Sequence, residues 1–181
     1  AEASGRLKRR PGEHLGRERP LGWFRERYDA VFISTGLVRS QPLPTATRRP
    51  QGVVDALYFL RRMKDDPAAR VPERVAVLGG GNTAMDAARS ALRMGAEEVV
   101  VLYRRTRKEM PARAEEIENA EKEGVKFVFL VQPVEFLSDS GQAVNGIKLT
   151  KMRLGPPDAS GRPRPIPTGE YTYFEADTVI N

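Results

Sequence analysis

The sequence predicts an α/β protein with a Rossmann-like parallel sheet, helices on both faces of that sheet, and a small antiparallel β-meander. Three observations support this prediction. The apolar run 75–78 is followed by three glycines and then by the alanine-rich stretch 83–94, in the order strand, turn, helix. Two further strand patterns, 98–103 and 125–131, enclose a second helical stretch, and right-handed crossovers make such a series a parallel sheet. Proline-punctuated apolar runs after residue 133 predict the meander.

The chain before the glycines divides into a polar segment, a strand and a connector. Residues 1–27 are rich in charge and show no period, so we expect loop with one short helix near its end. The apolar run 28–36 predicts a buried strand. Within the connector, an amphipathic pattern from Val53 to Lys64 predicts a helix that packs on the domain.

The three glycines open a G-x-G-x-x-A fingerprint formed by Gly79, Gly81 and Ala84. In a dinucleotide site the first glycine permits a tight turn, the second lets the backbone approach a pyrophosphate, and the small third residue lets helix and strand pack closely. The helix start adds free N–H groups and the positive end of the helix dipole. We therefore predict a dinucleotide site here, with the Asn82 and Thr83 side chains donating hydrogen bonds to the pyrophosphate and nicotinamide end.

The end of the next strand predicts which dinucleotide is bound. Strand 98–103 ends about 20 residues after the glycines, where a ribose-reading residue belongs. An NAD site would place Asp or Glu there, but Tyr103 is followed by Arg104 and Arg105, and then by Arg107. Guanidinium groups pair with phosphate in a bidentate fork, so this cluster favours the 2′-phosphate of NADP(H). The alternative is a solvated loop.

The predicted cofactor-binding residues share two places, the glycine turn with its helix and the end of the following strand. We name no catalytic acid or base and no metal ligand. Asp86 lies inside the helix, where it either orients local groups or is simply solvated. The predicted set is Gly79, Gly80, Gly81, Asn82, Thr83, Ala84, Asp86, Tyr103, Arg104, Arg105 and Arg107.

The remaining elements follow in order. Residues 112–123 predict a charged helix that Gly124 ends; its Arg113, Glu115 and Glu116 either line the cofactor mouth or form the wet face of the helix. We expect the meander to use three short strands and a stiff exposed loop, 155–167, rich in proline. A final strand returns to the parallel sheet. The meander strands are 134–138, 143–154 and 171–175, and the final strand is 177–180.

Composition and charge narrow the function classes. The chain has 181 residues, no cysteine and one histidine, which excludes a thiol redox pair or a thiolate-held iron–sulfur cluster in this stretch. Residues 1–72 carry 15 basic and 8 acidic residues, whereas residues 73–181 carry 15 and 16. The basic excess therefore lies outside the fingerprint domain, which argues against a nucleic-acid-binding role for that domain. No apolar run approaches a membrane span, and we expect a cytoplasmic protein.

The motifs together resemble the NADPH-binding domain of the glutamate synthase small (beta) subunit. The wider group of FAD-dependent pyridine nucleotide oxidoreductases includes NADPH-dependent ferredoxin oxidoreductase subunits and dihydropyrimidine dehydrogenase. The resemblance implies an NADPH-dependent flavoprotein oxidoreductase that delivers hydride from NADPH to FAD, with electrons passing onward through iron–sulfur clusters elsewhere to glutamate synthesis or to ferredoxin. The motifs that carry it are 79–86, 103–105, 110–113, 123–127, 154–162 and 176–180.

The resemblance also implies a domain plan and partners. In the family, a strand like 28–36 closes the FAD domain, with Ser34 here in place of the usual alanine. We expect residues 1–45 to be a basic segment and the closing strand of an incomplete FAD domain, 46–72 a connector helix, and 73–181 the NAD(P)H-binding domain. The implied partners are the missing FAD domain or subunit and the glutamate synthase large subunit or a ferredoxin-type acceptor.

Two function classes remain as alternatives to an oxidoreductase domain. One is a catalytically silent nucleotide-binding or scaffold module, although a scaffold has no need of the intact glycines or the arginine pair. The other is a nucleic-acid-binding role for residues 1–27, where the basic residues concentrate.

Overall fold

The computed structural model describes residues 8, 10–34, 50–66, 68–139, 141–159 and 161–181, which belong to two compact units, Ala1–Val38 and Arg39–Asn181. The parts of the predicted strand and connector within residues 35–49 lie outside the described residues, as does Ser140 in the predicted meander turn. None of the described helices combines the length and the apolar composition that a bilayer span requires.

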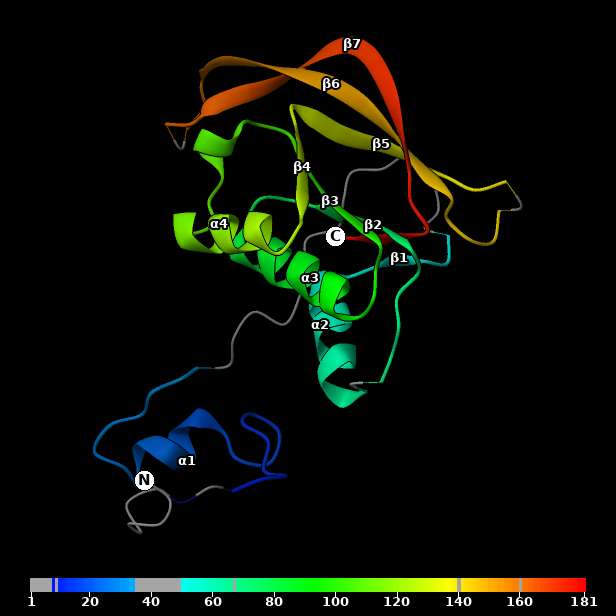
Figure 1. Ribbon diagram of the computed structural model, residues 1–181. Helices are drawn as coiled ribbons and strands as arrows, with labels where there is room; N and C mark the ends of the chain where they lie inside the picture. Colours follow the sequence, from blue (N-terminus) through cyan, green and yellow to red (C-terminus); the bar gives the residue numbers. More distant parts are fainter. Residues whose placement is uncertain (1–7, 9, 35–49, 67, 140, 160) are drawn as a thin grey trace. The chain divides into compact units, whose positions relative to one another are not determined.

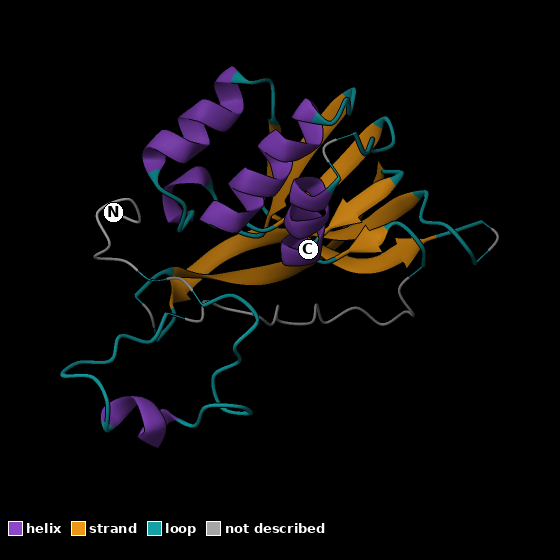
Figure 2. Cartoon of the chain, turned by 90° about the horizontal axis from the view of Figure 1, so that it is seen from below, coloured by secondary structure: helices purple, strands orange, loops and turns teal. Residues whose placement is uncertain are grey.

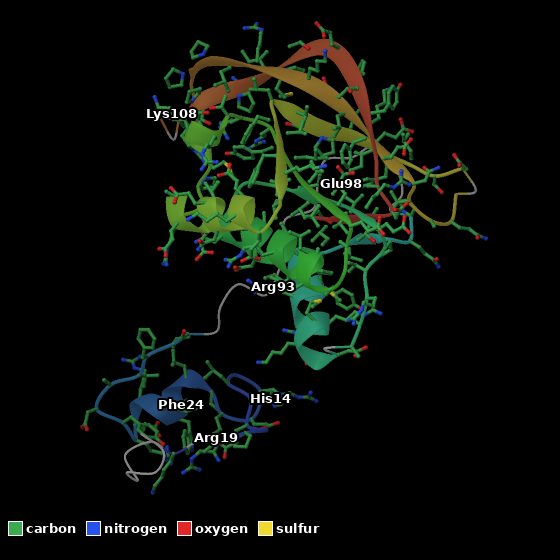
Figure 3. All side chains as sticks on the ribbon, viewed as in Figure 1. His14, Arg19, Phe24, Arg93, Glu98 and Lys108 are labelled. Atoms are coloured by element: carbon green, nitrogen blue, oxygen red, sulfur yellow. The ribbon has the colours of Figure 1, made fainter. Side chains whose placement is uncertain are left out.

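The first unit contains one short helix, α1 (Leu21–Arg25). Arg19 (labelled in Figure 3) and Arg27 lie against the Trp23 ring, 4.4 and 4.6 Å from its centroid. The predicted buried strand is wrong for residues 28–34, which have no strand structure; the Phe32 side chain is 92% exposed. A strand needs a hydrogen-bonded neighbour, and no described strand pairs with this segment.

The second unit is built on a five-stranded parallel sheet of order β1-β8-β2-β3-β4 (Figure 1). Its alternate residues point to opposite faces: Val75 and Val77 of β2 join one core, while Ala76 joins the other. The strands are β1 (Val53–Val54), β2 (Arg74–Leu78), β3 (Glu98–Tyr103), β4 (Lys126–Phe129) and β8 (Thr178–Ile180).

Different layers cover the two faces of this sheet (Figures 1 and 2). Three helices cover one face: α2 (Ala56–Asp65), α3 (Asn82–Arg93) and α4 (Ala114–Lys122). An antiparallel sheet of order β5-β6-β7 covers the other: β5 (Val131–Leu137), β6 (Gly146–Pro157) and β7 (Pro163–Glu175). The predicted parallel sheet with helices and a small antiparallel sheet is confirmed. One detail is corrected: the helices lie on one face, because Phe136, Ile147 and Leu149 of the second sheet fill the other.

Two boundaries of the antiparallel sheet differ from the sequence prediction. The predicted strand 125–131 ends at Phe129, because Leu130 has a positive φ of 58° and turns the chain into β5. The predicted exposed loop 155–167 is wrong, since β6 and β7 extend through most of it. Three of its prolines, Pro163, Pro165 and Pro167, lie in β7, an edge strand, where proline is tolerated.

An arginine–carboxylate cluster joins β2 to β8 at the amino end of the sheet. Asp177 accepts hydrogen bonds from the backbone N–H of Arg74 at 3.1 Å and from its guanidinium at 3.1 and 2.8 Å. Glu175 pairs with the same guanidinium. These hydrogen bonds hold the pKa of the Asp177 carboxyl below its usual value and raise that of Arg74.

The lowered pKa of Asp177 predicts a pH-dependent contribution to stability. A carboxyl with a depressed folded-state pKa stabilises fully above its unfolded pKa of about 3.9 and loses that contribution as the pH falls through the folded value. Asp177→Asn is therefore expected to lower the free energy of unfolding by about 1 kcal/mol at neutral pH, since the pair is partly exposed. Urea denaturation at neutral and strongly acidic pH checks this. Equal differences from wild type at both pH values would contradict it, and Glu118→Gln, an exposed acid of α4, serves as the control.

Candidate functional site

Gly79 and Gly80 form the turn between β2 and α3, and the chain's own geometry requires both. Gly79 has φ of +124°, a conformation that L side chains rarely adopt, and its N–H donates to the Leu102 carbonyl at 3.1 Å. A Cβ on Gly80 would lie 2.7 Å from Cε2 of Tyr103. The tight turn predicted at Gly79 is therefore present, and the tyrosine ring accounts for the middle glycine.

Gly81 differs from both neighbours because nothing in the described chain requires it. It is the N-cap residue of α3, with an ordinary extended conformation (φ −91°, ψ 173°), and a Cβ there would meet no atom within 4 Å. Ser, Asp or Asn would cap the helix better. The absent side chain leaves open space at the first turn of α3, where backbone N–H groups lack intrahelical partners.

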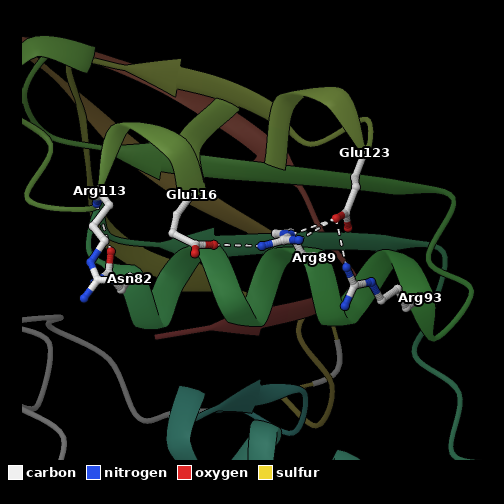
Figure 4. Close-up of polar contacts among 6 residues, drawn as sticks. All are labelled: Asn82, Arg89, Arg93, Arg113, Glu116 and Glu123. Atoms are coloured by element: carbon white, nitrogen blue, oxygen red, sulfur yellow. Dashed lines mark hydrogen bonds and ion pairs between the residues drawn. The ribbon is translucent and has the colours of Figure 1, made fainter. Parts of the chain in front are cut away.

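The segment before α4 is hydrogen-bonded to the glycine turn. The Ala112 N–H donates to the Gly80 carbonyl at 3.0 Å, and the Arg113 N–H donates to Oδ1 of Asn82 at 3.0 Å (Figure 4). This use of the Asn82 oxygen leaves its amide nitrogen as the donor group. The sequence interpretation missed that residues 112–113 fix the turn, because hydrogen bonds across thirty residues leave no periodic signal.

Ion pairs between helices hold α3 against α4. Arg89 of α3 lies between Glu116 of α4 and Glu123, the C-cap residue of that helix, with nitrogen–oxygen distances of 2.8 and 2.7 Å; Arg93 contacts Glu123 at 2.8 Å (Figure 4). These arginines lower the pKa of Glu123. Glu116, one of the residues considered for the cofactor mouth, is thus engaged in helix packing. The exposed side chains of α3 include Thr83 and Asp86, whose predicted roles stay predictions.

The segment after β3 is a fixed turn. The buried Tyr103 donates its hydroxyl to the Glu109 carbonyl at 2.8 Å. Thr106 and Glu109 form a capping box around η1 (Arg107–Glu109), with the Thr106 N–H 3.0 Å from the Glu109 carboxylate. Hydrogen bonds from Thr106 lower the pKa of Glu109. The arginines that follow Tyr103 therefore start from a rigid backbone.

The three predicted phosphate-binding arginines lie in three different environments. Arg104 is exposed, and its side chain makes no hydrogen bond or ion pair with the described part of the chain. Arg105 is 3% exposed and is hydrogen-bonded to Asp158 and the Pro163 carbonyl. Arg107 is ion-paired with Glu121 of α4. Arg104 lines a pocket of about 260 Å³ together with Leu78, Gly79, Leu102, Tyr103, Val131, Gln132 and Pro133.

These features suit a ligand that carries two anionic groups. The helix start at Gly81 offers N–H groups and open space, as a pyrophosphate requires. Arg104 follows β3, which pairs in parallel with β2, so both features lie at the carboxyl ends of adjacent strands. The residues present therefore fit a dinucleotide with a further phosphate on its ribose.

Gly80→Ala tests the contact between the turn and Tyr103. The new methyl group would overlap the ring, so we expect a loss of about 1–3 kcal/mol in the free energy of unfolding. Gly81→Ala is the matched control and is expected to change stability by less than about 1 kcal/mol, because its methyl group enters open space. Thermal denaturation of both variants measures the difference; equal losses would contradict the packing explanation.

Comparisons with known proteins show the family to which the chain is similar. The family model described as "pyridine nucleotide-disulphide oxidoreductase" matches residues 15–180. The chain is 42% identical over 174 residues to the NADPH-Fe(3+) oxidoreductase subunit beta of Geobacter sulfurreducens, covering 92% of this chain and 25% of that protein. It is 43% identical over 177 residues to a putative glutamate synthase [NADPH] small chain of Cereibacter sphaeroides, covering 92% and 42%.

A solved structure shares the fold. FprA of Mycobacterium tuberculosis in complex with NADPH superposes with a TM-score of 0.69 at 20% sequence identity, over 92% of this chain and 52% of that chain. The chain thus spans between a quarter and about two fifths of the curated relatives described above.

Proposed function

Because the chain belongs to the pyridine nucleotide-disulphide oxidoreductase family, we propose that it is the NADPH-binding part of a flavin-dependent oxidoreductase. Its relatives at about 40% identity include proteins whose names specify NADPH as the electron donor. When bound, NADPH supplies a hydride and FAD accepts it, so the chain's residues bind and orient rather than transfer protons.

One observation carries this proposal: the open space at Gly81 above the start of α3. The described chain gives no steric or backbone reason for a glycine at that position. A ligand that approaches the backbone closely supplies the reason, and a pyrophosphate at a helix N-terminus does so. The neighbouring Gly79 and Gly80 are not evidence for a ligand, because the fold requires a glycine at both positions with or without one.

The residues around this space have distinct proposed roles. The first N–H groups of α3 bind the pyrophosphate, and the Asn82 amide nitrogen and the Thr83 hydroxyl donate to the pyrophosphate and nicotinamide end. Ala84 is buried where α3 packs on β2, which keeps the helix start close to the strand end. Arg104 pairs with the 2′-phosphate and so favours NADPH over NADH.

We propose an electron route like that of the glutamate synthase small subunit. Electrons would pass from FAD through iron–sulfur clusters of other protein parts to glutamate synthesis, with the glutamate synthase large subunit as partner. A ferredoxin-type acceptor is the second candidate, which the family resemblance implies.

Two measurements test the proposal. Titration of NADPH, followed by nicotinamide fluorescence, is expected to show saturable binding that Gly81→Val removes. In a flavoprotein that contains this chain together with its FAD-binding part, anaerobic mixing with NADPH is expected to bleach the visible absorbance of oxidised flavin. Saturable binding with a flavin that stays oxidised would contradict the hydride route, and the absence of binding would contradict the site itself.

A further inference from the structure

Arg105 connects the end of β3 to the distant hairpin between β6 and β7. Its Nε donates to the Pro163 carbonyl at 2.7 Å, and its NH2 group donates to Oδ2 of Asp158 at 2.6 Å. The guanidinium side chain is 3% exposed, whereas that of Asp158 is 29% exposed. A short, charge-assisted contact at a buried cation is of the strong kind of hydrogen bond.

The hairpin tip is itself closed by hydrogen bonds. The Asp158 N–H donates to the Arg162 carbonyl at 2.8 Å, and the Gly161 N–H donates to the Asp158 carbonyl at 2.9 Å. These hydrogen bonds fix the backbone at Asp158 independently of the contact between its carboxylate and Arg105. The Leu130 N–H also donates to the Arg105 carbonyl, at 3.2 Å, which holds the arginine's backbone to the start of the antiparallel sheet.

These contacts bear on the neighbouring residue, Arg104. The buried anchor of Arg105 fixes the backbone on which Arg104 stands, and Arg104 is the member of the pair that is exposed and lines the pocket at the strand ends. To reach a ligand phosphate, Arg105 would have to leave the interior and abandon both Asp158 and the Pro163 carbonyl. Leaving buried polar groups unpaired is costly.

We propose that Asp158 is a positioning residue for NADP selectivity, acting through Arg105 to hold Arg104 where it pairs with the 2′-phosphate. This assignment rests on the proposed function. It gives the β6–β7 hairpin tip a role in cofactor choice although Asp158 lies 53 positions after Arg105 in the sequence. In this proposal Arg104 binds the 2′-phosphate, and Arg105 holds Arg104 in position.

Asp158→Asn tests the assignment, with Glu170→Gln as the matched control. Both replacements remove one negative charge from the same hairpin, but Glu170 pairs with Lys151 on the exposed surface. Calorimetric titrations measure the dissociation constants of NADP⁺ and NAD⁺. We expect Asp158→Asn to weaken NADP⁺ binding about tenfold and to leave NAD⁺ binding unchanged. The control is expected to leave both unchanged.

A second background separates positioning from a general loss of structure. In an Arg104→Ala protein, Asp158→Asn is expected to cause no further loss of NADP⁺ affinity, because the residue through which it acts is absent. Asp158→Glu, which keeps the charge, is expected to recover part of the selectivity.

The contrary outcomes are distinct. Tighter NADP⁺ binding by Asp158→Asn would overturn the proposal, because it would mean that Arg105, once released, binds the phosphate itself. Equal weakening of NADP⁺ and NAD⁺ would overturn it as well and would indicate a structural role. If wild-type protein binds neither nucleotide, the proposed function fails and this assignment fails with it; if wild type prefers NADP⁺ and Asp158→Asn matches it, this assignment alone fails.

Discussion

Gly81→Val is expected to remove NADP⁺ binding while the chain keeps its fold. The valine side chain would fill the open space at the start of α3, where the pyrophosphate is proposed to lie. Because no atom outside the neighbouring residues lies within 4 Å of a Cβ there, and the backbone is already extended, we expect the fold to tolerate the substitution. We expect a loss of at least about 100-fold in NADP⁺ affinity, measured by calorimetric titration.

Stability measurements separate this effect from unfolding. Valine caps a helix less well than glycine, so a destabilisation of about 1 kcal/mol is expected. Gly80→Ala is expected to lower stability more than Gly81→Val does, because its methyl group overlaps Tyr103. Unchanged NADP⁺ affinity in folded Gly81→Val protein would show that the pyrophosphate does not occupy this space.

Arg104→Ala is expected to weaken NADPH binding by about 10- to 100-fold and NADH binding hardly at all. A guanidinium–phosphate pair is a charge-assisted contact worth about 1.5–3 kcal/mol, and NADH lacks the phosphate that it meets. The double replacement Arg104→Ala with Arg105→Ala is likewise expected to weaken NADPH much more than NADH. Paired titrations with the two nucleotides measure the ratio.

A distant arginine controls for the loss of positive charge. Arg93 lies in the last turn of α3, at the opposite end of that helix from the glycine turn, and its side chain is 63% exposed. Arg93→Ala is expected to leave the ratio of NADPH to NADH affinity as in wild type. Equal losses for both nucleotides in Arg104→Ala would contradict the 2′-phosphate assignment.

Local patterns of the sequence predict the central part of the fold. Hydrophobic patterns within short stretches predicted β2, α3 and β3, because each pattern has the period of its own secondary structure. These three elements are present as predicted. The boundaries that differ depend on long-range pairing. Leu130 breaks an apolar run because β5 begins a different sheet, and the prolines of β7 pair with β6 along an edge.

The site shows the same division between local and long-range information. The conformation of the Gly79 turn follows from neighbouring residues, so the fingerprint located it. The environments of the arginines do not follow from neighbouring residues. Arg105 is bound by a carboxylate 53 positions away, and Arg107 by one 14 positions away. The hydrogen bonds from residues 112–113 to the turn are equally long-range. The assignment of a phosphate to this cluster stays a prediction, and the proposal above gives it to Arg104 alone.

The claim that this chain is an NADPH-binding domain is tested most directly by thermal shifts with NADPH, NADP⁺, NADH and NAD⁺ at matched concentrations, with FAD as a control. A ligand at about 100 times its dissociation constant stabilises the folded state by about 2.7 kcal/mol, which a melting curve resolves easily. We predict a clear shift with NADPH and NADP⁺ and a much smaller one with NADH and NAD⁺. Equal shifts with all four nucleotides would contradict the phosphate reading by Arg104, and no shift with any of them would contradict the dinucleotide site.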